Sequence, residues 1–142
     1  MKEIERFIAR DRFAKHLGIE LSGHEEGRAR ARMEVKDHHL NSAGTVHGGA
    51  LFSLADAVFS VASNSRGTLA VAINVSIAYF KAVASGTLFA HAEEVSLNPR
   101  LATYLIRIED GEGTPVALFQ GTVYRKKEKL TDLIGENTTS GF

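Results

Sequence analysis

The chain of 142 residues is the size of one domain and is long enough to bury a single core. Its 17 basic and 17 acidic side chains give a formal net charge of zero, and no stretch gathers the lysines and arginines that phosphate-backbone binding needs. The sequence therefore argues against a nucleic-acid partner. It contains no cysteine, which excludes disulfides and thiolate metal sites and suits a reducing cytoplasm.

The sequence shows no pattern typical of a targeting or membrane-spanning segment. Charged residues run through the opening stretch, MKEIERFIARDRFAKHLGI, where a signal peptide would have an apolar core. The longest apolar run, Ala50 to Ala62, is too short to cross a bilayer and contains a carboxylate, Asp56. We therefore expect a soluble, cytoplasmic protein without a membrane partner.

Two elements are predicted before the longest apolar run. Apolar residues at helical spacing predict an amphipathic helix from Glu3 to Leu17, so that residues 1–17 form an N-terminal helical segment. Residues 27–35, GRARARMEV, alternate between charged and apolar side chains, which is the pattern of a half-buried strand with a solvated face.

A helix and four strands are predicted next. Residues 48–66 are apolar on nearly all sides, which predicts a helix buried in the core. Turn residues then separate four apolar stretches, which predict strands, and the polar end of the chain is expected to be a loose tail. These segments are LAVAINVSIAYF (69–80), TLFAHAEEVS (87–96), LATYLIRIE (101–109), PVALFQGTVYR (115–125) and the tail at 126–142.

The order of these elements predicts the fold class. The breaks between the strands are short, so neighbouring strands are expected to pair antiparallel. Residues 1–142 are therefore expected to form a single α+β domain, in which an antiparallel sheet curls around one long helix.

Polar residues share one face of the predicted core helix. Ser53, Asp56 and Ser60 lie three or four residues apart, and serine hydroxyls at such positions usually bond to the preceding turn. Asp56 has no basic residue three or four positions away, so a buried carboxylate there needs a partner from elsewhere. It is either half of an ion pair with a distant arginine, or a general base or nucleophile whose pKa is tuned by partial burial.

The residues that precede this helix favour a catalytic role for Asp56. His47, Gly48 and Gly49 stand where the helix begins, and backbone N–H groups at a helix start are unpaired and carry a partial positive charge. Glycines there let the carbonyl of another molecule approach the backbone, so the N–H groups can form an oxyanion hole. A glycine pair alone would fit an ordinary turn equally well.

Spacing along the helix predicts self-association. Asp56 follows Gly48 by eight residues and Gly49 by seven, which is about 10 to 12 Å at about 1.5 Å per residue. Reacting groups must approach within about 3 to 3.5 Å. If both serve one site, two antiparallel copies of the helix are needed, and the protein must be at least a dimer.

The stretch NSAGTVHGGALFSLADAVFSVASNSRG (41–67), followed by VAINVSIAYF and VALFQGTVYR, resembles the hotdog-fold acyl-CoA thioesterases of the phenylacetate-degradation type. The resemblance covers residues 17–125 and implies a sheet wrapped around the helix, a dimer that commonly pairs into a homotetramer, and active sites at the dimer interface. The implied activity is hydrolysis of an acyl-CoA thioester to free acid and coenzyme A. The acyl group would be small and aromatic, such as phenylacetyl or hydroxyphenylacetyl, or of medium length.

The resemblance also implies roles for particular residues. Asp56 would act as a base on water or as a nucleophile on the thioester, and the backbone N–H of Gly48 or Gly49 would hold the thioester oxygen. His47 and Asn41 would orient that loop, the substrate or the water. No cofactor is implied, because coenzyme A is part of the substrate. The residues expected to touch coenzyme A, the basic ones at its phosphates, are Asn74, Tyr79, Asn98, Arg100 and Lys126.

Several other functions are not supported by the sequence. His38 and His39 are adjacent and lack a third ligand at a suitable spacing, so no metal site is expected. GTVHGG lacks the Lys-Ser/Thr of a phosphate loop, and no serine lies in a G-x-S-x-G elbow. Two alternatives stay open: an enoyl-CoA hydratase or dehydratase on the same fold, and a non-catalytic acyl-CoA-binding protein. Leu51, Phe52 and Phe59 are expected to fill the core rather than line an acyl pocket.

Overall fold

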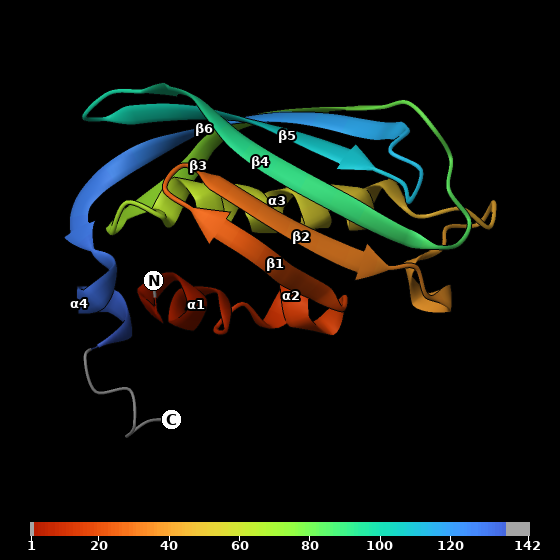
Figure 1. Cartoon of the computed structure of the whole chain (residues 1–142), viewed down its shortest axis with the longest axis horizontal. Helices are drawn as coiled ribbons and strands as arrows, with labels where there is room; N and C mark the ends of the chain where they lie inside the picture. Colours follow the sequence, from red (N-terminus) through yellow and green to blue (C-terminus); the bar gives the residue numbers. More distant parts are fainter. Residues whose placement is uncertain (1, 136–142) are drawn as a thin grey trace.

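The computed structural model of the chain describes residues 2–135, which form a six-stranded sheet with one long helix against it and shorter helices outside (Figure 1). The elements in chain order are α1 (Lys2–Ile8), α2 (Arg12–His16), β1 (Ile19–Glu25), β2 (Arg28–Glu34), the 3-10 turn η1 (Asp37–His39), α3 (Gly48–Asn64), β3 (Thr68–Tyr79), β4 (Thr87–Leu97), β5 (Leu101–Glu109), β6 (Pro115–Lys129) and α4 (Leu130–Ile134).

All strand pairs in the sheet are antiparallel, in the order β1-β2-β4-β5-β6-β3. The predicted α+β class is confirmed, and so is the pairing of β4 with β5 and of β5 with β6. The prediction that β3 pairs with β4 is wrong, because β3 pairs with β6 and β4 pairs with β2. The connection over residues 80–86 is too long for a tight hairpin. It carries the chain from the β3 edge of the sheet to β4, which lies between β2 and β5.

β1 was not predicted from the sequence. It pairs with β2 at one edge of the sheet, contains no fully buried residue, and has an irregular register between Leu21 and Gly23. Because serine, glycine and glutamate interrupt its apolar residues, the alternation that marks a strand is weak there.

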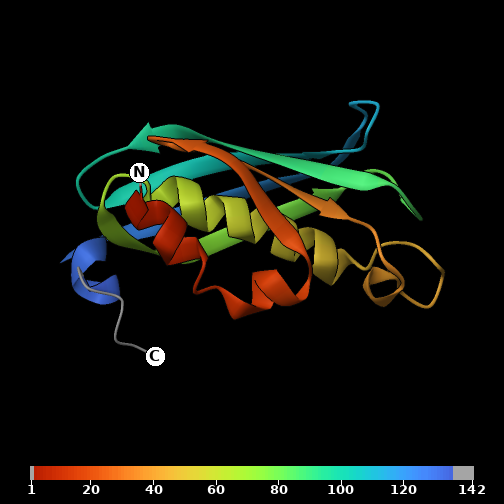
Figure 2. The same cartoon turned by 60° about the horizontal axis from the view of Figure 1, so that its bottom comes forward.

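The N-terminal helical segment is divided, in contrast to the single helix predicted over Glu3 to Leu17. α1 ends at Ile8, and α2 begins after Asp11, whose side chain accepts a hydrogen bond of 2.9 Å from the Ala14 N–H. Aspartate is a strong N-cap residue, so the capping of a second helix overrides the continuous apolar pattern. Figure 2 shows both helices lying beside α3 and outside the sheet.

The core lies between α3 and the inner face of the sheet. The Phe59 ring packs against Tyr104 and Phe119, with ring centroids 5.9 Å and 5.5 Å away, and these three side chains are nearly inaccessible. Leu51 is also part of the core, whereas Phe52 is only half-buried. The expectation that these α3 side chains fill the core is confirmed for Leu51 and Phe59.

The end of the described chain is ordered, which corrects the expectation of a loose tail from residue 126. Residues 126–129 continue β6, and residues 130–134 form α4, in which Leu130 and Ile134 are buried. The N-terminal segment holds this helix, since Arg6 of α1 and Arg10, just after α1, donate to the carbonyls of Gly135 and Leu133. The rest of the predicted tail lies outside the described residues. Within residues 2–135, no helix is both long enough and apolar enough to cross a bilayer.

Candidate functional site

The loop before α3 is organised by Asn41. Its side-chain oxygen accepts hydrogen bonds from the Ala43 N–H at 2.9 Å and the Thr45 N–H at 3.1 Å, and its backbone N–H donates to the Thr45 carbonyl at 2.7 Å. The Asn41 side chain therefore shapes the loop that leads into the helix. Of the roles expected for Asn41, the structure supports orientation of the loop.

His47 caps α3. Its backbone is extended, its N–H donates to the His39 carbonyl at 2.7 Å, and its ring Nδ1 accepts from the Gly49 N–H at 2.8 Å. This hydrogen bond occupies the amide of Gly49. Among the described residues, the N–H of Gly48 has no acceptor, so it is the amide at the helix start that is free to bind an incoming oxygen.

Tyr79 lies against the same helix start. Its hydroxyl donates to the Gly48 carbonyl at 3.1 Å, and a Cβ on Gly48 would lie 3.2 Å from the tyrosine ring. The end of β3 therefore braces the first turn of α3. Tyr79 was expected to contact coenzyme A, and the structure places it at the helix start instead of with the expected basic residues.

Asp56 lies two turns further along α3 and is half-buried. Its carboxylate has no hydrogen-bond or ion-pair partner within residues 2–135, so the structure does not contain the distant arginine of the structural alternative. Burial raises the pKa of Asp56, and the negative charge of Asp11 raises it further. A carboxylate kept partly out of water and unpaired is unfavourable for stability, which is typical of a functional group.

The serines on this face of α3 have ordinary structural roles. Ser53 donates its hydroxyl to the Gly49 carbonyl at 2.7 Å, and Ser63 donates to the Ser60 carbonyl at 3.3 Å. These bonds to the preceding turn are those expected of serines in a helix. Asp56 is therefore the unusual member of the polar face.

The other residues expected to touch coenzyme A are not gathered around the helix start. β3 lies opposite β6, with Tyr79 opposite Ala117 at one end and Thr68 opposite Lys129 at the other. Asn98, Arg100 and Lys126 lie toward the Thr68 end, because Leu101 pairs with Tyr124 there. Asn74 is exposed in the middle of β3. Within one chain, these side chains do not form a single site with Gly48.

Local contacts explain two of these residues. The Asn98 side chain accepts from the N–H groups of Arg100 and Leu101 at 3.0 and 2.8 Å, which closes the turn between β4 and β5. Lys126 forms an exposed ion pair with Glu128 at 3.6 Å. Asn98 therefore has a structural role in the turn.

The histidine pair has a structural role. His39 is buried, its Nδ1 accepts from the Lys36 N–H at 2.9 Å, and its Nε2 lies 2.7 Å from the Leu17 carbonyl. Because a carbonyl only accepts, the second contact requires a proton on Nε2, and both ring nitrogens are engaged by the backbone. No group of three or more potential metal ligands occurs among residues 2–135.

Two depressions adjoin the polar face of α3. An open groove of about 450 Å³ runs past the helix start, lined by residues that include Phe13, His47, Gly49 and Phe52. A smaller, mainly apolar cavity lies between α3 and the N-terminal helices, and Ala57, the residue after Asp56, lines it. Asp11 lines this cavity and was not identified from the sequence. The available signal was its position in the middle of a predicted helix. Aspartate is unfavourable inside a helix but favourable at the N-cap, so it could have indicated the start of a second helix.

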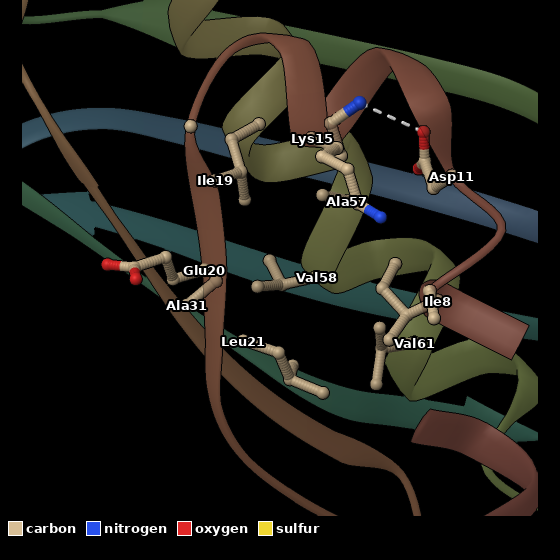
Figure 3. Close-up of a pocket in the computed structure, with 13 residues that line it drawn as sticks. Ile8, Asp11, Lys15, Ile19, Glu20, Leu21, Ala31, Ala57, Val58 and Val61 are labelled. Carbon is tan, nitrogen blue, oxygen red and sulfur yellow. Dashed lines mark hydrogen bonds between the residues drawn. The ribbon is translucent and has the colours of Figure 1, made fainter. Parts of the chain in front are cut away.

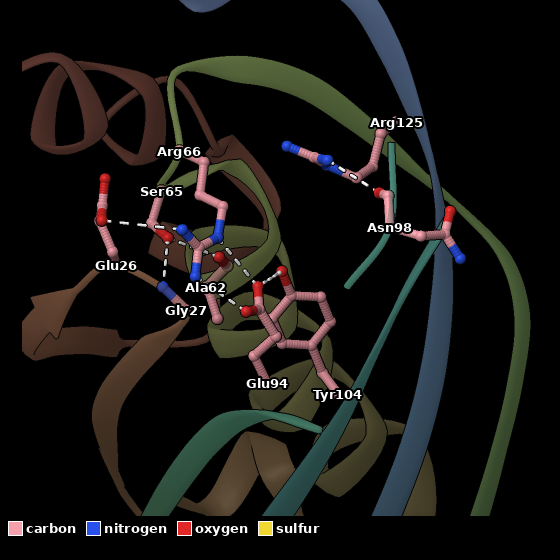
Figure 4. A network of polar contacts seen from close by, with 9 residues as sticks. All are labelled: Glu26, Gly27, Ala62, Ser65, Arg66, Glu94, Asn98, Tyr104 and Arg125. Atoms are coloured by element: carbon pink, nitrogen blue, oxygen red, sulfur yellow. Dashed lines mark hydrogen bonds and ion pairs between the residues drawn. The ribbon is translucent and has the colours of Figure 1, made fainter. Parts of the chain in front are cut away.

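A polar network at the other end of α3 is structural (Figure 4). Arg66 donates to Glu94 through Nε at 3.1 Å and Nη2 at 2.8 Å, and the Tyr104 hydroxyl donates to the same carboxylate at 2.7 Å. Burial favours the protonated form of Glu94, but the bonds from Arg66 and Tyr104 outweigh it and lower the pKa of Glu94. This network joins the end of α3 to β4 and β5.

Comparison with known proteins defines the family. The model of the thioesterase superfamily matches residues 43–117, which include the loop, α3 and β3 to β5. A putative esterase of Archaeoglobus fulgidus is 46% identical over 119 residues, which cover 83% of this chain and 77% of that protein. The acyl-coenzyme A thioesterase PaaI of Escherichia coli is 39% identical over 116 residues, which cover 81% of this chain and 83% of that protein.

Solved structures agree with the sequence matches. The E. coli PaaI protein from the phenylacetic acid degradation operon has a TM-score of 0.87 and 35% identity, over 90% of this chain and 94% of that one. A Thermus thermophilus protein has a TM-score of 0.79 and 44% identity, over 82% of this chain and 99% of that one.

The chain belongs to the thioesterase superfamily, and its sheet around α3 is the hotdog fold. Membership of this family and the relatives that carry the activity make it a thioester hydrolase. The resemblance noted in the sequence is thereby confirmed for the family, the fold and the class of enzyme.

Proposed function

We propose that this protein hydrolyses acyl-CoA thioesters, with Asp56 as the catalytic carboxylate. The observation that carries the proposal is the pairing, on one helix, of a free amide at Gly48 with an unpartnered, half-buried carboxylate at Asp56. An ionised Asp56 either removes a proton from the attacking water or attacks the thioester carbon itself.

The N–H of Gly48 receives the oxygen that becomes negative when the carbonyl carbon is attacked. Its place at the first residue of α3 adds the partial positive charge of the helix start. As the tetrahedral intermediate collapses, the carbon–sulfur bond breaks and coenzyme A leaves as a thiolate, which takes up a proton. If Asp56 is the attacking group, water then hydrolyses the acyl anhydride, which releases the free acid and restores the carboxylate. His47 and Asn41 position this amide through the cap and the loop. No cofactor is required.

The site is shared between two subunits. Gly48 and Asp56 are about 12 Å apart along α3 at about 1.5 Å per residue, so they meet at one thioester only if each comes from a different copy. The exposed edge of the sheet favours such a dimer: β3 is an edge strand with Val71 38% and Ile73 57% exposed. A long apolar edge is a surface on which a second strand pairs.

The substrate is a small aromatic or medium-length acyl-CoA. Support comes from the similarity to the PaaI acyl-coenzyme A thioesterase and to a structure from a phenylacetic acid degradation operon. Coenzyme A would cross the dimer interface, which is how the distant Arg100 and Lys126 of one subunit could meet its phosphates.

The test is release of free thiol from a panel of acyl-CoA esters by wild type and by Asp56→Asn. We expect wild type to release thiol and Asp56→Asn to lose about 10²- to 10⁴-fold in kcat, the contribution of a positioned acid or base. Wild-type turnover by Asp56→Asn would contradict the role of Asp56. Conversion of an enoyl-CoA without thiol release would favour the hydratase alternative, and binding without turnover would favour the non-catalytic one.

A further inference from the structure

A mainly apolar cavity, partly open to solvent, lies between α3, the N-terminal helices and β1 (Figure 3). Its volume is about 280 Å³. Ala57, Val58 and Val61 of α3 form one wall, and Ile8 of α1 with Ile19 and Leu21 of β1 lie across from them. The uncharged side chains that enclose it are all aliphatic, and the charged residues that line it are Asp11, Lys15 and Glu20.

Small side chains create this space. Ala57 is 5% exposed, lies outside the contiguous core cluster and lines the cavity. Protein interiors are close-packed, and an unfilled apolar void of this size lowers stability. An apolar pocket that the chain leaves unfilled can accept an apolar group.

The cavity lies at the level of Asp56. Ala57 follows Asp56 directly, and Asp11, which lines the cavity, is close enough for its charge to act on the Asp56 carboxylate. Asp11 also lines a neighbouring depression with Ser60, one turn beyond Asp56 on the same helix face. Asp11 and Ala57 therefore place this cavity along the part of α3 that carries Asp56.

We propose that this cavity holds the acyl group of the substrate and selects an apolar acyl chain or ring without a polar substituent. The assignment rests on the function proposed above. The volume falls just below the range of roughly 300 to 1,000 Å³ that takes a drug-sized ligand, so the cavity suits an acyl group but not coenzyme A. A hydroxyl at its aliphatic inner end would lose its hydrogen bonds to water without a replacement.

The open groove at the helix start is the competing site. It is larger and carries polar groups of His47 and Ser53 among apolar ones, which suits the amide-containing arm of coenzyme A. An acyl-CoA thioester has an acyl group on one side of its carbonyl and coenzyme A on the other. The apolar cavity suits the acyl group, and the more polar groove suits coenzyme A.

The experiment measures kcat/KM for octanoyl-CoA relative to acetyl-CoA by thiol release. Ala57→Leu fills the cavity and is expected to lower this ratio at least tenfold, because removing room for a few methylenes from an apolar pocket changes selectivity by about 10- to 200-fold. The matched control, Phe13→Ala, changes the competing groove and is expected to leave the ratio unchanged. Wild type is expected to prefer phenylacetyl-CoA to its para-hydroxy derivative.

Each outcome bears on the pocket separately from the reaction. An active wild type whose ratio is unaltered by Ala57→Leu, or altered by Phe13→Ala instead, overturns the acyl pocket and leaves the proposed function standing. A wild type that releases no thiol from any ester overturns both. If Ala57→Leu fails to fold, Leu21→Ala serves as the second variant. It enlarges the cavity and should raise kcat/KM for acyl chains longer than octanoyl, and an unchanged kcat/KM for these chains overturns the pocket.

Discussion

Asp56 combines two requirements that oppose each other. It must be ionised to act, yet burial and the charge of Asp11 both favour its protonated form and raise its pKa above the ordinary 3.8. A raised pKa makes the carboxylate a stronger base once it is ionised. The pH at which activity appears therefore reports on its surroundings.

In a profile of kcat/KM against pH, activity is expected to fall on the acidic side at a pH above the ordinary pKa of aspartate. This acidic limb is expected to move to lower pH in Asp11→Asn. Asparagine keeps the oxygen that accepts from the Ala14 N–H but removes the charge that acts on Asp56. A pH profile of wild type and variant, with denaturation curves as a check on the fold, measures the shift. A limb that stays in place would show that the charge of Asp11 does not reach the catalytic group.

Asp56 also lowers stability at neutral pH. Because its pKa is higher in the folded than in the unfolded protein, stability falls as pH rises through the interval between the two values. Asp56→Asn is therefore expected to unfold at a higher urea concentration than wild type at pH 7, with an unchanged slope. The difference should vanish below the unfolded-state pKa. A destabilised variant would mean that the carboxylate has a structural partner.

Gly121 is a close-packing position in the core. A Cβ there would lie 2.6 Å from Cζ of Phe59, a ring that is held by its neighbours. Gly121→Ala is expected to lower the free energy of unfolding by about 1 to 3 kcal/mol, as overpacked cores do. The control is Gly111→Ala, where a Cβ would meet nothing within 4 Å. Equal stability of the two variants in urea titrations would contradict this packing.

At the scale of elements, the network of Arg66, Glu94 and Tyr104 fixes the end of α3 to the sheet. Glu94→Gln is expected to lower the free energy of unfolding by about 1 to 3 kcal/mol at neutral pH, because a partly buried arginine then keeps only its more distant charge partner, Glu26. The pKa of Glu94 is lowered, so its stabilisation is present above the ordinary value of 4.5 and is lost as pH falls through the lowered one. Denaturation at several pH values measures both effects.

Elements were predicted well where their pattern is local and less well where tertiary contacts decide. The continuous apolar pattern of α3 and the alternation in β2 suffice to identify them. β1 has weak alternation, and the order of the strands depends on which edges meet, which no local pattern contains. In the site, the spacing of His47 and Asp56 singled out both residues, whereas the contact of Tyr79 with Gly48 and the nearness of Asp11 arise from packing alone.

At the scale of the whole molecule, the shared site requires a dimer that buries the β3 edge. Ile73→Lys places a charge at an exposed apolar position of that edge and is expected to give a monomer that loses activity while remaining folded. Light scattering and thiol release on the same sample measure both properties. Val95→Lys, at an exposed apolar position on the interior strand β4, is the control for added charge. An active monomer would show that one chain holds a complete site.

The shared site is tested most directly by combining two inactive variants. Asp56→Asn lacks the carboxylate, and Gly48→Pro lacks the amide hydrogen. Proline suits the backbone of the first helical residue, and the Tyr79 ring, 3.2 Å from the new Cβ, must move by a few tenths of an ångström. In a mixed dimer, the Gly48 of one subunit and the Asp56 of the other would form one intact site. Thiol release by the co-expressed pair should then recover to about a quarter of wild type, since half of randomly assorted dimers are mixed and each has one of two sites. No recovery in mixed dimers shown to have formed would contradict a site shared between subunits.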